Sequence, residues 1–331
     1  MSFKAENNSL YHDLTIGQTR IRGNLLLAPL AGYSDAAFRS ICIAHGASLC
    51  HTEMISAEAV YRGNEKTLSL LDRGRDETDY AIQMFASNPV SAASCTRKIN
   101  EYNPVLIDLN CGCAVTKILK SGCGAVLLRN PHLIGEIVRA ISENTSIPVT
   151  IKLRSGWDAH ELSYVEASCI AVENGAKAVT LHPRTRSEGF SGHSDWSQIG
   201  KLKSLLDVPV LGSGDLFSPQ DAQAMITQTE CDGVMFARGA IGNPFIFNQT
   251  RAFLENVQPA QASDKQRLDT MLRHLMLMMD FKPERIACRE MRKHAAHYFK
   301  GIHNAGVLRR EINQAQKYSE YEDIVIRNNQ E

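Results

Sequence analysis

The sequence has no long apolar run. Its best hydrophobic stretch, residues 25–31, is far shorter than the ~18 apolar residues that a membrane-spanning helix needs. The first residues, MSFKAENN, lack the apolar segment of a secretory signal peptide. We therefore expect a cytoplasmic protein that makes no contact with a membrane.

An excess of charge of one sign is also missing. Lys and Arg together number 36, as do Asp and Glu, so the formal net charge is zero. This balance argues against binding of nucleic acid by bulk charge, but it leaves room for a local basic face. Nine cysteines, an odd number in a chain of this size without an export signal, make a disulfide framework unexpected. The 44% of hydrophobic residues exclude an intrinsically disordered chain.

Short apolar runs alternate with longer amphipathic stretches along the first 250 residues. The runs are almost continuously apolar, as in parallel strands that are buried on both faces. Eight such units in about 250 residues predict an α/β fold, a closed (β/α)8 TIM barrel. An open Rossmann-like sheet is the alternative, and it is weakened because no GxGxxG motif follows the first run. The predicted strands are 24–28, 48–52, 80–85, 105–109, 149–153, 178–181, 208–211 and 233–236, and the clearest predicted helices are 35–45, 89–101, 131–144, 161–174 and 219–228.

This alternation stops near Glu255. Residues 258–263 have the composition of a short linker, and three helical patterns follow, at 264–281, 283–299 and 307–316, with Gly301 and Gly306 as breaks. The sequence therefore predicts two domains. They are a barrel over residues 1–257 and a small all-helical domain over residues 258–331.

Active sites of TIM barrels lie at the carboxyl ends of the strands. In this sequence, the loops after the seventh and eighth predicted strands carry Gly212, Gly214 and Gly239. Such loops commonly bind a phosphate group, and we favour this interpretation over the alternative, which is that the glycines only form ordinary turns. Gln83 and Lys152, on other strand ends, suit a flat heterocycle that becomes negative on reduction.

Cys113 is the strongest candidate for chemistry, because it follows the fourth predicted strand directly. A thiol there can act as a general acid or as a nucleophile, depending on its pKa. A metal site of Cys111, Cys113 and Cys123 is disfavoured, since a fourth ligand is missing and a Cys-x-Cys pair is awkward for one tetrahedral ion. We therefore expect no metal and a buried structural Cys111. His182, beside Arg184 at a strand end, is either a core histidine or a functional one.

Residues 282–317 are strongly basic. They contain nine Lys and Arg but only three Glu, with Tyr298 and Phe299 among them. This segment could bind an RNA backbone. A solvated helix face would have the same composition, and charge alone favours that second interpretation.

Several of these segments resemble the tRNA-dihydrouridine synthases, and most closely their bacterial B-type branch. The resemblance extends over about residues 14–318. It rests on APLAGYSD at 28–35, DLNCGCA at 108–114, KLRSGW at 152–157, LHPRTR at 181–186, GSGD at 212–215, DGVMFARGAIGNP at 232–244, REMRKH at 289–294 and LRREINQA at 308–315.

The resemblance implies an FMN-dependent reduction of uridine to dihydrouridine in tRNA, with NADPH, or else NADH, as the reductant. Hydride would pass from reduced FMN to C6 of the uracil, and Cys113 would supply the proton to C5. The partner would be tRNA, and we expect a monomer. The resemblance implies that FMN is held by Pro29, Leu30, Ala31, Gln83, Lys152, His182, Ser213, Gly214, Asp215, Ala237 and Arg238, and that the substrate is contacted by Asn110, Arg154, Arg184, Arg289, Arg292 and Lys293.

Three alternatives stay open at this point. The first is a small-molecule FMN-dependent reductase on the same barrel, similar to dihydroorotate dehydrogenases, which leaves the basic segment unexplained. The second is dihydrouridine synthesis in another RNA. The third is a non-catalytic RNA-binding module with a relic barrel, which does not account for Cys113, Lys152 and Arg154 occurring together.

Overall fold

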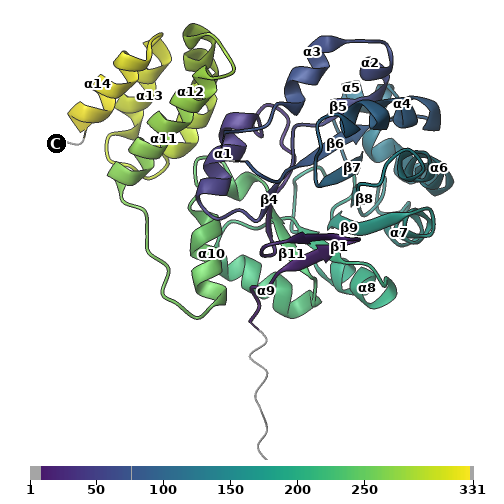
Figure 1. The fold of residues 1–331 in the computed structure, drawn as a ribbon. Helices are drawn as coiled ribbons and strands as arrows, with labels where there is room; N and C mark the ends of the chain where they lie inside the picture. The colour runs from purple at the N-terminus through teal and green to yellow at the C-terminus, as the bar shows by residue number, and fades with distance from the viewer. Residues whose placement is uncertain (1–8, 76, 329–331) are drawn as a thin grey trace, which may run out of the picture.

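A ring of parallel strands surrounded by helices forms the larger part of the molecule, and four more helices stand beside it (Figure 1). The structure, a computed structural model, describes residues 9–75 and 77–328. Its parallel sheet has the order β4-β3-β11-β10-β9-β8-β7-β6-β5. The strands are β3 (Leu25–Leu27), β4 (Leu49–Cys50), β5 (Ile55–Ser56), β6 (Ala81–Phe85), β7 (Leu106–Cys111), β8 (Val149–Arg154), β9 (Ala176–His182), β10 (Val210–Ser213) and β11 (Gly233–Phe236).

The sheet closes through the second predicted strand, which is divided into β4 and β5. β4 pairs with β3, while His51, directly after β4, bridges to Ala81 of β6, and β5 pairs further along β6. Both edges of the sheet therefore meet at one strand position, which makes the sheet a barrel. The predicted (β/α)8 barrel is confirmed, and all eight predicted strands are present.

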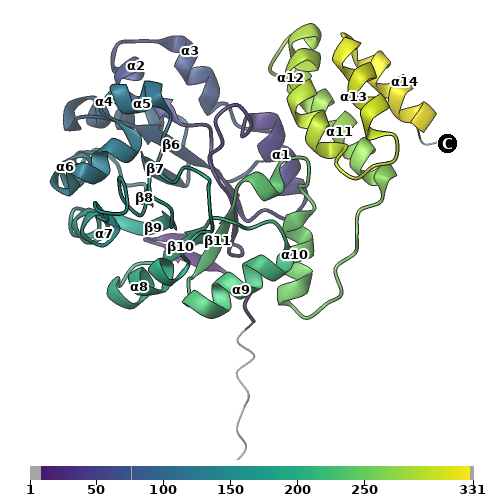
Figure 2. The ribbon, with the colours of Figure 1, turned by 180° about the vertical axis from the view of Figure 1, so that it is seen from behind.

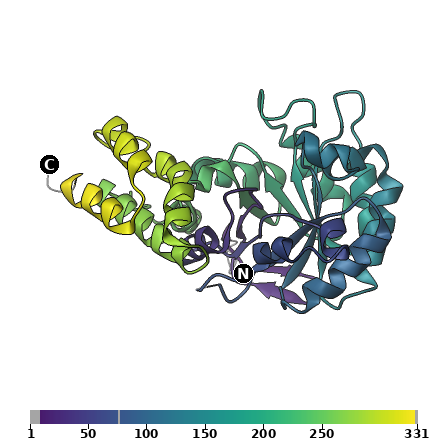
Figure 3. The same cartoon turned by 90° about the horizontal axis from the view of Figure 1, so that it is seen from above.

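An antiparallel hairpin that the sequence did not predict covers one end of the barrel. It consists of β1 (Leu14–Ile16) and β2 (Thr19–Ile21). Its apolar side chains join a buried cluster with residues of several barrel strands, among them Leu26 and Leu106. Leu106 and Ala81, both in this cluster, are the first residues of β7 and β6, so the hairpin closes the amino-terminal end of the barrel. Figure 3 shows the purple hairpin at one end and teal loops rising from the opposite end.

Helices surround the barrel, and several begin where the sequence predicted. Asp35 caps α1 by accepting a hydrogen bond from Phe38 N at 3.0 Å, and Ser218 caps α9 by accepting one from Asp221 N at 3.1 Å. Both caps satisfy backbone N–H groups that the first turn leaves free. The barrel helices are α1 (Ala36–Ala44), α2 (Ala57–Tyr61), α3 (Glu65–Leu68), α4 (Pro89–Asn100), α5 (Thr116–Lys120), α6 (Pro131–Ser142), α7 (Tyr164–Glu173), α8 (Ser197–Leu205), α9 (Pro219–Thr229) and α10 (Ile246–Leu254), with 3-10 turns at Ser69–Leu71, Gly124–Arg129 and Arg238–Ala240.

The four C-terminal helices have a hydrophobic core of their own, which also takes in Ala37 and Ile41 of α1. An extended segment leads to them from α10 along the outside of the molecule (Figure 2). The predicted break at Gly306 is wrong, because this glycine lies in the first turn of α13, and the last helix was not predicted. No described helix is long and apolar enough to cross a membrane. The four helices are α11 (Asp264–Met279), α12 (Glu284–Tyr298), α13 (Ala305–Gln314) and α14 (Tyr318–Asn328).

Candidate active site

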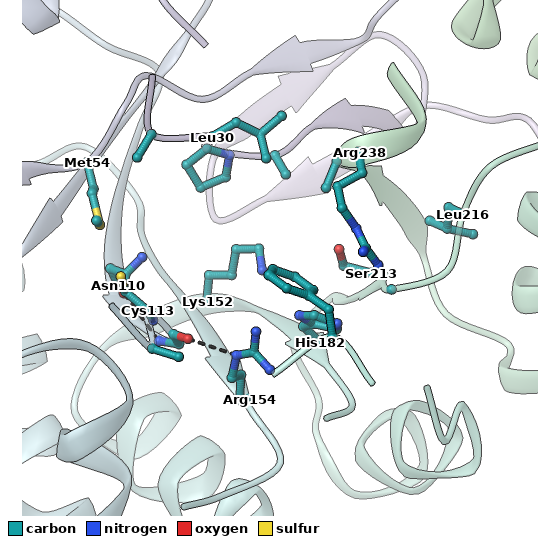
Figure 4. Close-up of a pocket in the computed structure, with 18 of the residues that line it drawn as sticks. Leu30, Met54, Asn110, Cys113, Lys152, Arg154, His182, Ser213, Leu216 and Arg238 are labelled. Carbon is teal, nitrogen blue, oxygen red and sulfur yellow. Dashed lines mark hydrogen bonds between the residues drawn. The ribbon is translucent and has the colours of Figure 1, made fainter. Parts of the chain in front are cut away.

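A cavity of about 390 Å³ opens at the carboxyl ends of the barrel strands. Figure 4 shows side chains from several strands and their following loops converging on it. Met54, Phe190, Leu216 and Phe217 also line it, and the sequence reasoning did not select them. The predicted site residues that line it are Pro29, Leu30, Ala31, Gln83, Asn110, Cys113, Lys152, Arg154, His182, Ser213, Gly214, Asp215, Ala237 and Arg238.

Four buried polar side chains form a chain of hydrogen bonds next to this cavity. Gln83 Nε2 donates to Asp108 Oδ2 at 2.7 Å, and Asn110 Nδ2 donates to Gln83 Oε1 at 2.9 Å. Thr150 Oγ1 donates to the other oxygen of Asp108 at 2.6 Å. The Gln83 amide is therefore held in one orientation, with one N–H and one lone pair left for a ligand. Asp108 was not among the predicted site residues, although it lies in the strand segment that carries them.

The same chain of hydrogen bonds fixes the loop that carries Cys113. Asn110 Oδ1 accepts from Cys113 N at 3.0 Å and from Gly112 N at 3.2 Å. Burial raises the pKa of the half-buried Cys113 thiol, while the Val115 N–H and the Arg154 guanidinium act in the opposite direction. The thiol is thus protonated at neutral pH, as a general acid must be. Cys111 is fully buried in the hydrophobic core and is not among the residues lining the cavity, which confirms its expected structural position.

Lys152 and His182 determine which charges line the cavity at this point, a cation and a neutral imidazole. Among the described residues, Lys152 Nζ has no hydrogen-bond or ion-pair partner, and Figure 4 shows it pointing into the cavity. Burial and the nearby Arg154 guanidinium lower the pKa of Lys152 to about 8. Burial and the surrounding cations, Lys152 first, lower the pKa of His182 to about 2, so this imidazole is neutral. A half-buried ammonium that has no partner among the described residues favours an anionic or electron-rich ligand.

Arg154 connects two loops at the rim of the cavity. Its Nε donates to Gly112 O at 2.9 Å, and its Nη1 donates to Thr185 O at 3.0 Å and to Gly189 O at 2.8 Å. Burial and the neighbouring Arg184 lower the pKa of Arg154 to about 10, so it stays charged at neutral pH. The Arg154 guanidinium has further N–H groups that do not bond to these carbonyls, and they are available to a ligand.

Arg184 does not line the cavity, because its guanidinium is used inside the protein. It is 2% exposed and donates to both carboxylate oxygens of Asp215, at 3.0 and 2.8 Å. Asp215 also accepts from Ser194 N at 2.8 Å. Burial alone would raise the pKa of Asp215, but these donors lower it. The Arg184–Asp215 pair holds the loops after β9 and β10 together and so shapes the cavity. Both oxygens of the Asp215 carboxylate are already hydrogen-bonded to protein groups.

Two glycines let the backbone approach the other side of the cavity. Gly214 has φ +110°, and a side chain there would also meet His182 and Ser194. A side chain on Gly239 would collide with the carbonyl oxygen of Leu216. Arg238, 41% exposed at its side chain, stands between these loops. Bare backbone beside a guanidinium is the arrangement that binds phosphate groups.

The three predicted residues of α12 lie outside the cavity. Arg289 is exposed and has no hydrogen-bond or ion-pair partner within the described part of the chain. Arg292 is half-buried, and its Nη2 donates to Ala315 O at 3.1 Å, which ties α12 to the end of α13. Lys293 Nζ lies 5.3 Å from the centre of the Tyr33 ring, in the loop that leads from β3 to α1. Lys293 therefore brings a positive charge from the helices to the rim of the barrel.

A sequence profile of the dihydrouridine synthases matches residues 26–330, which is almost the whole chain. The chain belongs to the dihydrouridine synthase family. The family predicted from the sequence is thereby confirmed, as is the enzyme class, an oxidoreductase.

Curated relatives agree with this family over nearly their full length. A probable tRNA-dihydrouridine synthase of Treponema pallidum is 44% identical over 306 residues, covering 89% of this chain and 90% of the relative. A tRNA-dihydrouridine synthase B of Pasteurella multocida is 31% identical over 301 residues, covering 91% of each chain. Among solved structures, morphinone reductase in complex with tetrahydroNAD superposes with a TM-score of 0.51 at 11% identity, covering 79% of this chain and 94% of the reductase. That likeness concerns the barrel fold.

Proposed function

We propose that this protein is a flavin-dependent tRNA-dihydrouridine synthase of the cytoplasm, with FMN as cofactor and NADPH as reductant. Residues 1–257 are the catalytic domain and residues 258–331 the tRNA-binding domain. One observation carries the proposal beyond family membership. Cys113, a protonated thiol, and Lys152, an ammonium with no partner in the part of the chain that the structure describes, line one cavity. The opposite side of this cavity is backbone beside Arg238.

The residues present fit FMN. The backbone at Gly214 and Gly239, with the Arg238 guanidinium, suits the phosphate, because both glycines line the cavity without a side chain. The isoalloxazine ring would lie against Lys152 and the neutral His182 imidazole. Gln83 would offer it the N–H and the lone pair that the protein does not use. When bound, FMN would supply the hydride for C6 of the uracil, with NADPH as the source of its electrons. Lys152 would stabilise the negative charge that the reduced ring carries.

Cys113 supplies the second hydrogen. Addition of hydride at C6 leaves an electron pair at C5, which takes the thiol proton, and the thiolate then regains a proton from water. Asn110 holds the Cys113 loop through two hydrogen bonds to backbone N–H groups, and Arg154 holds it through Gly112 O. The uridine must leave the RNA stack to reach this cavity.

The C-terminal helices would hold the RNA backbone beside the barrel mouth. Arg289 offers an exposed guanidinium with no partner within residues 9–75 and 77–328, and Lys293 places an ammonium next to the loop that follows β3. Arg292 is engaged with Ala315 O, and we assign it to positioning of the helix that carries the other two. Contacts of this kind supply affinity without reading the base sequence.

Two experiments test the proposal. The first maps dihydrouridine at each site of tRNA from cells with and without the gene, and the second examines the purified protein. The protein should be yellow, lose its flavin absorption on addition of NADPH and regain it with tRNA while dihydrouridine forms. A protein that cannot be reconstituted with FMN contradicts the cofactor assignment. Flavin reduction with unchanged dihydrouridine in every tRNA would instead favour a small-molecule reductase, and new dihydrouridine in another RNA would redirect the substrate.

A further inference from the structure

Phe190 is a large apolar side chain that the fold leaves open at the cavity. It lies in the loop of residues 183–196 between β9 and α8, lines the cavity and is 60% exposed. A phenyl ring that is mostly exposed contributes little to the core. Burial in the core therefore does not explain why a phenyl ring occupies this position at the cavity.

The backbone on both sides of Phe190 is held by buried arginines. Arg154 Nη1 donates to Gly189 O at 2.8 Å, and Arg184 donates to Ser191 O at 3.0 Å and to Gly192 O at 2.7 Å. Gly189 and Gly192 have φ of +60° and +65°, which lets the loop turn on either side of the ring. Three charge-assisted hydrogen bonds thus fix a short backbone segment, and Phe190 is the large side chain that this segment carries.

The ring stands among the polar groups of the site. The guanidinium carbon of Arg238 lies 4.4 Å from the ring centre and that of Arg154 lies 5.4 Å from it. The His182 ring is roughly parallel to it, with the two centres 6.2 Å apart. Arg154, which holds Gly189 O, also donates to Gly112 O next to Cys113. One guanidinium therefore sets the positions of both the aromatic ring and the proton-donating thiol.

We propose that Phe190 is the aromatic face on which the flipped-out pyrimidine stacks, and that Arg154 sets its position relative to Cys113. This inference rests on the proposed function. Unstacking the base from the RNA costs free energy, and an aromatic surface in the protein offsets part of that cost. A base stacked on Phe190 would also keep water from C5 and C6. The ring also lies beside Arg238 and His182, which we assign to the flavin. We assign the ring to the base because it is 60% exposed and because Arg154, which holds its loop, also holds the loop of Cys113.

Replacement of the ring tests this role directly. Phe190→Leu keeps an apolar side chain of similar volume but removes the aromatic face, and stacking on an aromatic side chain is worth ~1–3 kcal/mol per base, or about 5- to 150-fold. We expect kcat/KM for tRNA to fall at least about fivefold, with the dissociation constant for tRNA within about twofold because phosphate contacts dominate it. Phe190→Tyr should restore kcat/KM. Tyr61→Leu, which removes an equally exposed aromatic ring (54% exposed) outside the cavity, is the matched control.

Flavin measurements on the same variants separate base from cofactor. The Phe190→Leu protein should bind FMN and be reduced by NADPH as the unaltered protein is. Loss of FMN or slower reduction would show that the ring packs on the cofactor and would overturn the inference. Unchanged kcat/KM in Phe190→Leu would overturn it as well. If the unaltered protein forms no dihydrouridine, the proposed function itself fails, and that result is distinct from an effect of the variant.

Discussion

Lys282 Nζ lies 2.9 Å from Asp35 Oδ2, and this contact joins the turn between α11 and α12 to the start of α1. Lys282 also donates to Glu290 Oε2 at 2.7 Å, while the other oxygen of Asp35 caps α1. The side chains of Lys282 and Asp35 are 28% and 22% exposed, so water screens this ion pair only partly. Burial alone would raise the pKa of Asp35, but Lys282 and the neighbouring histidines bring it down to about 2. The pair therefore fixes the C-terminal helices against the loop that follows β3.

Removing this pair should weaken the interface without removing the cap. Asp35→Asn keeps a side chain that can cap α1 but leaves Lys282 without one of its two carboxylates. We expect a loss of about 1–2 kcal/mol in the free energy of unfolding, measured by urea denaturation at pH 7. Lys282→Met in the same protein should then cost less than it does alone. Arg20→Gln, which breaks the exposed pair with Asp13, should cost under about 1 kcal/mol; an equal loss there would contradict the special role of Asp35.

Acid should destabilise the same interface through His274. This imidazole is fully buried, and burial lowers its pKa to about 4, with Lys282 and Lys293 acting in the same direction and Asp35 against it. In the unfolded chain its pKa is near 6.5. The unfolded state therefore takes up a proton between pH 6.5 and 4 that the folded state does not, and stability present above pH 6.5 is lost as the pH falls. A shift of this size corresponds to roughly 3 kcal/mol.

Denaturation at pH 7 and at pH 5 checks this expectation. The free energy of unfolding should decrease less between these two pH values in His274→Gln than in the unaltered protein. The exposed His160 provides the control, and His160→Gln should leave the pH dependence as it is. An identical slope in the His274 variant would place the acid sensitivity elsewhere.

Cys113 should matter only in the half of the reaction that involves RNA. Cys113→Ala removes the proton donor but no group assigned to FMN, so flavin content and reduction by NADPH should stay unchanged. Formation of dihydrouridine should fall by roughly 10²-fold or more, a usual contribution of a general acid. Single-turnover mixing of the reduced protein with tRNA measures this step. Cys169→Ala, on α7 and outside the cavity, should react normally, and full activity of the Cys113 variant would move the acid to another group.

The barrel could be predicted because its strands are buried on both faces. Such strands are continuous apolar runs, so their positions and the polar residues after them, including Cys113 and Lys152, could be read directly. The hairpin β1–β2 was missed because three-residue strands show almost no periodicity. The break expected at Gly306 was wrong because a glycine in a first helical turn costs only a fraction of a kcal/mol, which packing in the bundle offsets.

The role of a residue could not be predicted from the sequence where it depends on a partner far along the chain. Arg184 follows a strand as a ligand-binding residue would, but its partner Asp215 lies 31 residues further along the chain. Asp108 lies within a strand, and only the register with β6 shows that it orients Gln83. For Phe190 a signal was present, since it is a single aromatic residue between two glycines in a polar loop. Its meaning depends on the arginines that hold this loop, which only the structure shows.

Arg289 and Lys293 should bind tRNA through phosphates. The double variant Arg289→Gln, Lys293→Gln should bind tRNA more weakly, and the slope of log K against log salt should become shallower by about 0.7–0.9 for each lost contact. Reduction of the flavin by NADPH without RNA should not change, because neither side chain lines the cavity. Lys177→Gln, an exposed change at the start of β9 and so at the opposite end of the barrel, should leave the salt dependence unaltered. Binding isotherms at four salt concentrations decide the matter, since a solvated helix face without RNA contacts would give the same slope in all three proteins.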